Sequence, residues 1–274
     1  MVNQKEEVQS IMEEKTTEKV RRTTSRIGGV SIAWVTLFGA LCGVTGLVPI
    51  FPYVGGGGYV PLTTPLCAIA PLLLGPVGGI VAAAIGGIIG MFIAPAAYPL
   101  QIVDVFLNAV LPALFVALMI RDDRLWKVTV PLFIVLGIVG WLVPFYVPGA
   151  AAGFGRVPEP LYFIMAGLYW IPSTIIAATP LGTRLIPRWV VSKNRAQRYG
   201  GVFLAILAAM FVWWLPWTRP YWYLFNFSAE LGVATHVAYS WWVPALSAIT
   251  AVITVPIVEA LERSGLPKIE GAIW

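Results

Sequence analysis

Apolar residues fill long stretches of this chain, and charged residues are confined to the segments between them. No Asp, Glu, Lys or Arg occurs from Ile27 to Val103. A membrane-spanning helix needs about 20 apolar residues, so this stretch holds several spans, with Gly and Pro marking the breaks. Further charge-free stretches cover residues 105–120, 128–155, 160–183, 199–218 and 231–258. The pattern predicts eight membrane-spanning helices, over residues 28–51, 60–75, 76–95, 100–120, 127–147, 161–181, 200–217 and 241–261.

The second of these spans is shorter than the others. Residues 62–74 lie between Pro61 and the Gly75-Pro76 pair, and at 1.5 Å per residue they extend about 20 Å. We therefore expect a short, kinked or re-entrant helix here.

Composition supports the same class of protein. The 274 residues are 58% hydrophobic and only 11% charged, with a mean hydropathy of +0.82. Soluble domains carry about 25% charged residues, so these values exclude a disordered chain and disfavour a soluble globular one. The fold class predicted is all-α, a polytopic helical membrane protein.

The distribution of Lys and Arg predicts the orientation of the helices. With the N-terminus inside, all but two of the 18 Lys and Arg residues lie on the inner side, the exceptions being Arg156 and Arg219. Inner loops of membrane proteins are rich in these residues. We therefore expect a multi-pass protein of the cell membrane with both termini cytoplasmic. The net charge of +5 then reflects topology and contact with anionic lipids, and no nucleic-acid partner is expected.

Small residues recur at helical spacing in the first and third spans. Gly39 and Gly43 lie four residues apart in the first span, and Ala82, Gly86 and Gly90 follow the same spacing in the third. Such stripes allow another helix to approach closely. Two interpretations follow: packing between helices of this chain, or docking of a partner subunit on these five residues.

Polar residues within the apolar stretches are candidates for function because burying them in a membrane is costly. Gln101, Asp104 and Asn108 share one face of the fourth span, and Asp104 is the only acidic residue from Ile27 to Ile120. They could bind a cationic or hydrogen-bonding substrate or carry a proton. Alternatively, Asp104 makes a structural hydrogen bond or lies exposed at the membrane interface.

A second group of candidates lies in the aromatic segment 213–242, predicted to form an outer loop over residues 218–240. Arg219, Glu230 and His236 are its substrate-binding candidates. The aromatic residues form either an interfacial belt or a binding site for a flat or cationic ligand. Asn226 begins an Asn-Phe-Ser glycosylation sequon.

Chemistry beyond binding has little support in the sequence. One His, and Cys42 and Cys67 outside any metal-binding spacing, predict no metal site. Hydrolase, zinc-protease and ATP-binding motifs are absent. We therefore expect neither an enzyme nor a cofactor, and energy for any active transport would come from another subunit or an ion gradient.

The stretch from Pro61 to Gly87 resembles a known family. It contains a short apolar helix, the turn Leu74-Gly75-Pro76 and a Gly- and Ala-rich helix. This order resembles the second and third helices of the substrate-binding S components of energy-coupling factor (ECF) vitamin transporters. The resemblance extends usefully over residues 28–120.

The resemblance implies a function. S components bind a vitamin or its precursor from outside through six helices, and they dock through small residues on a transmembrane coupling subunit that paired cytoplasmic ATPases drive. This chain would then capture a small vitamin-like molecule, and the small-residue stripes would be its coupling surface. The organisation expected is a polar cytoplasmic tail over residues 1–25, a six-helix core over 26–190 and a two-helix extension over 191–274.

The extension and the count of eight spans depart from the family pattern. An alternative function is therefore a structural or accessory subunit of a larger membrane complex, with no substrate pocket of its own. A self-sufficient carrier or channel is a third possibility, which the scarcity of polar residues on span faces disfavours.

Overall fold

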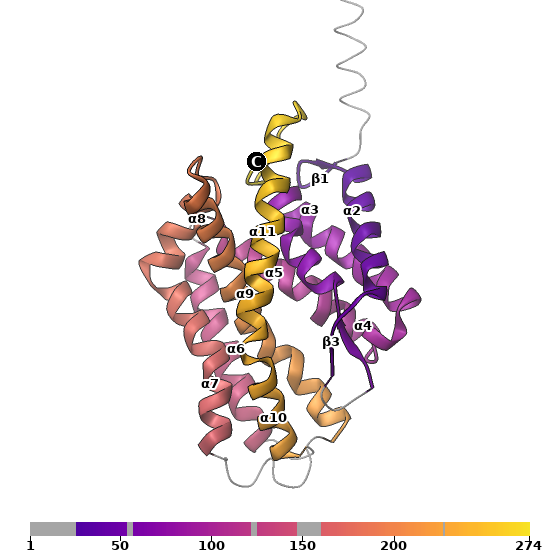
Figure 1. Ribbon diagram of the computed structural model, residues 1–274, viewed down its shortest axis with the longest axis vertical. Coiled ribbons are helices and arrows are strands. Elements are labelled where there is room, and N and C mark those ends of the chain that lie inside the picture. The colour runs from indigo at the N-terminus through magenta and orange to yellow at the C-terminus, as the bar shows by residue number, and fades with distance from the viewer. Residues whose placement is uncertain (1–25, 54–56, 122–124, 147–159, 227) are drawn as a thin grey trace, which may run out of the picture.

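The computed structural model describes residues 26–53, 57–121, 125–146, 160–226 and 228–274, and the predicted tail over residues 1–25 lies outside them. The described part is mainly helical, with two small two-stranded hairpins (Figure 1). Its helices, in order, are α2 (Ile32–Val44), η1 (Thr45–Leu47), α3 (Thr63–Ile93), η2 (Pro95–Ala97), α4 (Ile102–Asp104), the π-helix η3 (Val105–Val110), α5 (Leu111–Met119), α6 (Trp126–Tyr146), α7 (Pro160–Ala178), the π-helix η4 (Leu181–Leu185), α8 (Ile186–Val190), α9 (Arg195–Leu224), α10 (Ala229–Ser240) and α11 (Trp242–Arg263). The strands are β1 (Arg26–Ile27) with β2 (Val30–Ser31), and β3 (Pro49–Pro52) with β4 (Tyr59–Pro61).

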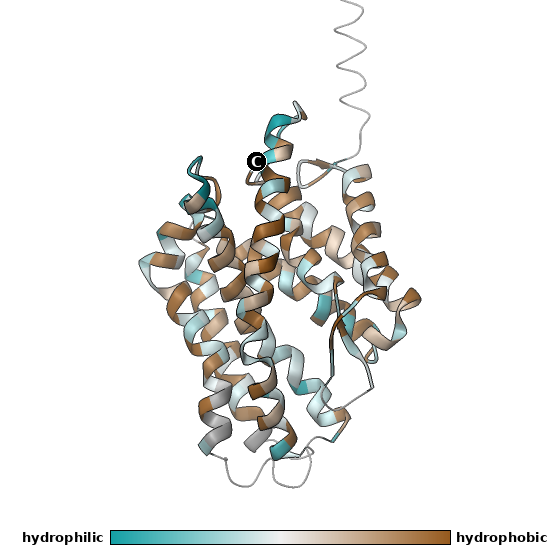
Figure 2. Ribbon diagram, viewed as in Figure 1, coloured by the Kyte–Doolittle hydropathy of each residue, from teal (hydrophilic) through white to brown (hydrophobic). Residues whose placement is uncertain are grey.

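Five helical segments of the described part are long and apolar enough to cross a membrane: 63–93, 102–119, 126–143, 195–224 and 230–263. Two shorter apolar segments cover 32–47 and 167–178. The predicted helical class is thus confirmed, and the helices are consistent with insertion in a membrane. Figure 2 shows apolar residues along the helices and hydrophilic residues gathered at the ends of α8 and α11.

The helix α3 contains two of the predicted spans and doubles back on itself. Gly75 has φ 70° and ψ 166°, outside the helical region. The Cys67 Sγ atom lies 4.0 Å from the Ala83 carbonyl oxygen, although 16 residues of straight helix would extend about 24 Å. The predicted break at Gly75-Pro76 is confirmed, and residues 63–74 form a short helix antiparallel to the second half of α3.

The end of the chain closes the break in α3. Pro76 has no N–H, so the Leu72 carbonyl loses its usual helical donor. The Ile273 N–H donates to this carbonyl at 3.0 Å, and the Trp274 indole Nε1 donates to the Leu73 carbonyl at 2.8 Å. Residues 269–274, which we refer to as the C-terminal segment, therefore act as a cap on the first half of α3.

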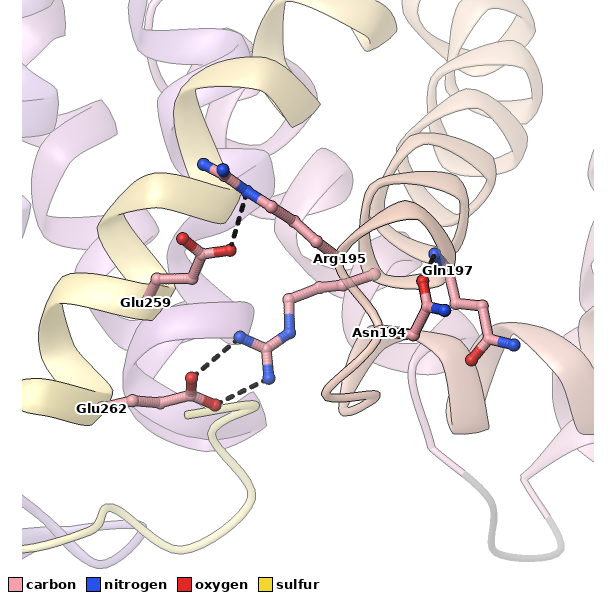
Figure 3. Close-up of polar contacts among 6 residues, drawn as sticks. Asn194, Arg195, Gln197, Glu259 and Glu262 are labelled. Carbon is pink, nitrogen blue, oxygen red and sulfur yellow. Dashed lines mark hydrogen bonds and ion pairs between the residues drawn. The ribbon is translucent and has the colours of Figure 1, made fainter.

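The strand β1, α8 and the C-terminus lie at one end of the molecule, and α10 lies toward the other (Figure 1). At the first end, two ion pairs join α9 to α11 (Figure 3). The Arg198 guanidinium donates to both Glu262 carboxylate oxygens at 2.9 and 2.7 Å, and Arg195 Nε lies 3.1 Å from Glu259 Oε1. The side of the membrane on which this end lies stays a prediction.

The small-residue stripes pack against each other within the chain. A Cβ atom added to Gly43 would lie 2.5 Å from Ile89 Cβ, and one added to Gly86 would lie 2.5 Å from Cys42 Cβ. Gly39 faces the Ala82 carbonyl oxygen in the same way, and Gly90 faces the Tyr98 ring. All five predicted docking residues are buried, Gly39, Gly43, Ala82, Gly86 and Gly90. The packing interpretation is therefore supported: the stripes bring α2 against the second half of α3.

The segment predicted as an outer loop, residues 218–240, is largely helical, and several of its aromatic side chains are buried. Helix α9 continues through Pro216 and Pro220 to Leu224, and α10 follows. Trp213, Trp214 and Trp222 are at most 1% exposed, so these side chains belong to the core rather than to an interfacial belt. Helix α9 packs against α5, α6, α7, α8 and α11, and one hydrophobic core runs across the predicted boundary at residues 190–191.

Candidate functional site

The Asp104 carboxylate is fully buried at the start of the predicted fourth span. The chain turns at Gln101, which has φ 53°, and α4 begins directly after it. The Leu100 N–H donates to Asp104 Oδ2 at 2.6 Å, and the Tyr221 hydroxyl donates to Oδ1 at 2.5 Å. A carboxylate in the first turn of a helix is favoured by the helix dipole. Asp104 is therefore held from two sides at a fixed position.

The β3–β4 hairpin covers this carboxylate. The Tyr53 hydroxyl, directly after β3, lies 3.3 Å from the Tyr221 hydroxyl. The Tyr53 ring lies 5.4 Å from that of Tyr221 and 5.8 Å from that of Trp217. The Tyr239 hydroxyl on α10 donates to the Pro52 carbonyl at 2.7 Å, which anchors the hairpin. Burial raises the pKa of Tyr53, so its phenol stays protonated and can donate a hydrogen bond.

Asn108, four residues after Asp104, and Trp217, whose ring contacts that of Tyr221, each carry a buried polar atom that has no hydrogen-bond partner within the part of the chain that the structure describes. The two atoms are Asn108 Oδ1 and Trp217 Nε1. The other amide atom, Asn108 Nδ2, donates to the Ala97 carbonyl at 3.4 Å. Buried polar atoms usually find a partner, so each of these two calls for an explanation. We refer to Tyr53, Asp104, Asn108, Trp217 and Tyr221 as the acid–aromatic cluster.

The π-helix η3 lies within this cluster. The Trp213 indole Nε1 donates to the Leu107 carbonyl at 2.6 Å, in the middle of η3. The Trp213 and Trp217 rings stack 4.9 Å apart. π-helical turns are rare and frequent at functional sites. Helix α9 thus donates a hydrogen bond to η3 through Trp213, and it contributes the rings of Trp217 and Tyr221 to the cluster.

Gln101 does not join the cluster. Its side chain is exposed, and its backbone carbonyl accepts from the Val105 N–H at 3.2 Å. Of the three polar residues predicted on one face, the structure brings Asp104 and Asn108 to the cluster.

The other predicted candidates separate into a buried pair and an exposed residue. Arg219 donates from Nε to the Gly140 carbonyl and from Nη1 to Thr218 Oγ1. The guanidinium carbon lies 4.2 Å from the Trp222 ring centroid, and the His236 ring lies 5.0 Å from the same ring. Glu230 is exposed in the first turn of α10. The three residues therefore do not form one site.

Arg219 and His236 join helices of the core. His236 Nδ1 lies 2.9 Å from the Gly232 carbonyl, and the Tyr169 hydroxyl donates to the His236 carbonyl at 2.7 Å. Together with the bond from Arg219 to Gly140, these contacts connect α6, α7, α9 and α10. We interpret this group as a structural network rather than a binding site.

Among the described residues, no group of three His, Cys, Asp or Glu side chains could hold a metal ion. Cys42 and Cys67 are free and buried. Asn226 is exposed, with φ 54°; the next residue of its sequon lies outside the described part, and its glycosylation stays a prediction.

Comparisons of the chain with protein-family models, with curated proteins and with solved structures find no match. The site is therefore interpreted from its own geometry.

The aromatic half of the cluster comes largely from the segment 213–242, for which an aromatic binding site was one of the two interpretations, but its aromatic residues were not among the predicted binding residues. Trp213, Trp217 and Tyr221 recur every four residues, and this spacing places them on one helical face. That signal was available, but the seventh span was predicted to end at residue 217, which placed Tyr221 in the outer loop. The approach of Tyr53 and Tyr221, which lie 168 residues apart in sequence, had no signal in the single chain.

Proposed function

We propose that this chain is a membrane-embedded solute-binding protein and that the acid–aromatic cluster recognises the solute. The observation that carries the proposal is the buried Asp104 carboxylate, held by Tyr221, in a cluster whose members Asn108 and Trp217 each carry a buried polar atom without a partner among the described residues. A buried charge and orphaned polar groups are costly. A bound solute would compensate for this cost by completing their hydrogen bonds.

The chemistry of the cluster selects a class of solute. Asp104 accepts hydrogen bonds or pairs with a cation, Asn108 Oδ1 accepts, and Trp217 Nε1 donates. The rings of Tyr53, Trp217 and Tyr221 offer aromatic faces and edges, which bind flat or cationic groups. The solute is accordingly a small, flat molecule with a cationic or N–H-bearing ring, a description that fits the vitamin-like ligands implied by the resemblance to S components.

Access to the cluster involves the β3–β4 hairpin. Tyr53 lies against Tyr221, and Tyr221 in turn occupies one oxygen of Asp104. A solute that pairs with this oxygen replaces the Tyr221 hydroxyl, and a shift of the hairpin opens the way to it. The Tyr239 hydroxyl bonds to Pro52, the last residue of β3 before Tyr53, so this shift also breaks that hydrogen bond.

The resemblance also implies partners, which we include in the proposal. The chain would work in the cell membrane with both termini cytoplasmic, together with a transmembrane coupling subunit and cytoplasmic ATPases. The coupling surface would lie outside the small-residue stripes, since these are buried between α2 and α3.

Solute binding to the purified protein in detergent tests the proposal. Quenching of tryptophan fluorescence is titrated with three probes: thiamine, a flat cation; riboflavin, a flat neutral ring system; and folate, a flat anion. We expect thiamine or riboflavin to bind, and Asp104→Asn to weaken binding at least tenfold. Glu230→Gln is the matched control, because Glu230 is an exposed acid outside the cluster; its affinity stays at the wild-type value.

Failure of all three probes to bind, or equal affinity in Asp104→Asn, contradicts the proposed site. Co-purification from the native host then decides between the two functions. A coupling membrane protein with an ATPase pair supports the transporter subunit. Stoichiometric recovery with other membrane subunits, combined with absent binding, supports the accessory-subunit alternative.

A further inference from the structure

A cavity unrelated to the acid–aromatic cluster lies at the end of the molecule that holds both Arg26 and the C-terminus. Its volume is about 360 Å³. The β1–β2 hairpin, the start of α2, the end of α11 and the C-terminal segment surround it. Most of its wall is apolar, formed by Trp34, Phe38, Leu73, Leu74, Ile257 and Leu261. We refer to it as the terminal groove.

The charged residues that line the terminal groove are both cations. They are Arg26 in β1 and Lys268 after α11, and both are exposed. Glu270 is nearby but does not line the groove: it packs against the backbone of Gly29, where an added Cβ atom would lie 3.2 Å from Glu270 Cβ. The groove thus combines an apolar wall with two positive charges.

One wall of the groove is fixed by hydrogen bonds. Trp274 lines the groove and donates through its indole Nε1 to the Leu73 carbonyl at 2.8 Å. The Ile273 N–H donates to the Leu72 carbonyl. The C-terminal segment therefore forms a defined wall opposite α2.

The groove continues onto surfaces that face outward. On α2, Ile32 and Trp34 are each 42% exposed, and Ile257 on α11 is 39% exposed. Both helices carry further exposed apolar side chains along their length, at Leu37, Leu41, Ile249 and Ile253. In a membrane these faces contact acyl chains, so the groove opens toward the hydrocarbon region on one side and toward Arg26 and Lys268 on the other.

We propose that the terminal groove binds one anionic phospholipid. An acyl chain lies against Trp34, Phe38 and Leu261, and the headgroup phosphate pairs with Arg26 and Lys268. Basic side chains next to a membrane attract anionic headgroups, and long cationic side chains reach the headgroup level while their stems stay on apolar surface. The amphipathic lining distinguishes a lipid from a free phosphate, which would leave the apolar wall uncovered.

Lipid retention measured by native mass spectrometry tests this proposal. The full chain is purified in mild detergent, and phosphatidylglycerol or phosphatidylcholine is titrated separately. We expect one phosphatidylglycerol to be retained more strongly than phosphatidylcholine. Arg26→Gln with Lys268→Gln weakens its binding by roughly 25-fold, as two cations near the headgroup each contribute about fivefold. Ile257→Trp, which narrows the apolar part and keeps both charges, also reduces retention.

The matched control removes two cations from the same end of the molecule. Arg188 and Lys193 are both exposed and do not line the groove, so Arg188→Gln with Lys193→Gln leaves retention unchanged. Equal loss in the control, or wild-type retention in the groove variants, overturns the proposal. If the groove variants instead release a co-purifying protein and keep the lipid, the groove is a protein interface and the proposal is wrong. If the double variant does not fold, the same measurement is made on Arg26→Gln and on Lys268→Gln separately.

Discussion

Trp213 and Trp217 are two buried indoles whose N–H groups have different surroundings. They are 0% and 4% exposed and stack on each other. Trp213 Nε1 donates to the Leu107 carbonyl, whereas Trp217 Nε1 has no partner among the described residues. Comparing substitutions of these two residues therefore separates the contribution of the indole hydrogen bond to stability from the contribution of ring burial.

Trp213→Phe is expected to destabilise the protein more than Trp217→Phe. Both variants lose a similar ring volume, but only the first leaves the buried Leu107 carbonyl without its donor, which costs about 1–3 kcal/mol. Thermal unfolding in detergent, followed by circular dichroism without added solute, measures the difference. Equal midpoints for the two variants would show that the bond to η3 adds no stability.

At this scale the sequence predicts the acid but not its surroundings. Asp104 stands out because it is the only acidic residue in a long apolar stretch. Its partner Tyr221 lies 117 residues away in sequence, and no local pattern marks such a pairing. Glu230 and Arg219 also stand out as charges next to aromatic residues, yet one is exposed and the other is bonded within the core.

At the scale of elements, the packing of α2 on α3 depends on the absence of side chains. Gly86→Ala places a Cβ atom 2.5 Å from Cys42 Cβ and 2.9 Å from the Gly39 carbonyl oxygen. Overpacking of this kind costs roughly 1–3 kcal/mol. We expect a lower unfolding temperature for this variant.

Gly200→Ala is the control for Gly86→Ala. Gly200 also lies within a helix, α9, and an added Cβ atom would make ordinary contact with the Trp189 ring at 3.7 Å. Alanine is favoured over glycine in helices by about 0.5–1 kcal/mol, so this variant keeps or raises the unfolding temperature. A smaller loss in Gly86→Ala than in Gly200→Ala would contradict the close packing of α2 on α3.

Helices were predicted well where apolar residues run without interruption, and less well where proline occurs. The break at Gly75-Pro76 coincides with a real change of direction because Gly75 adopts a positive φ. Pro216 and Pro220 do not end α9, since neighbouring helices in a membrane protein can compensate for the lost backbone bonds. A proline therefore marks a break here only where the adjacent residue can also leave the helical region.

At the scale of the whole molecule, two ion pairs of different burial join α9 to α11. The Arg198 side chain is 5% exposed and pairs with Glu262, whereas that of Arg195 is 64% exposed and pairs with Glu259. Glu262→Gln leaves a buried guanidinium without a counter-charge, and we expect a loss of about 2 kcal/mol. Glu259→Gln removes an exposed pair, which contributes less than about 1 kcal/mol. Unfolding temperatures of the two variants measure the difference, and a larger effect of Glu259→Gln would contradict this assignment.

The predicted orientation can be tested with single cysteines. Both native cysteines are buried, so the wild-type protein gives little background with a membrane-impermeant maleimide. Glu230→Cys, in the first turn of α10, is expected to react in intact cells. Lys193→Cys, at the end that holds both Arg26 and the C-terminus, is expected to react only after permeabilisation. The reverse pattern would invert the orientation, and reaction of both variants in intact cells would contradict a membrane-spanning arrangement.

The cap formed by the C-terminal segment also sets an order for biosynthesis. Trp274 and Leu73, which it joins, are 201 residues apart in sequence. At 5–20 residues per second, synthesis of the intervening chain takes about 10–40 s. During that interval the first helices leave the ribosome with the turn at Gly75 still uncapped. The hairpin of α3 therefore has to persist as an incomplete intermediate until residues 269–274 have been made.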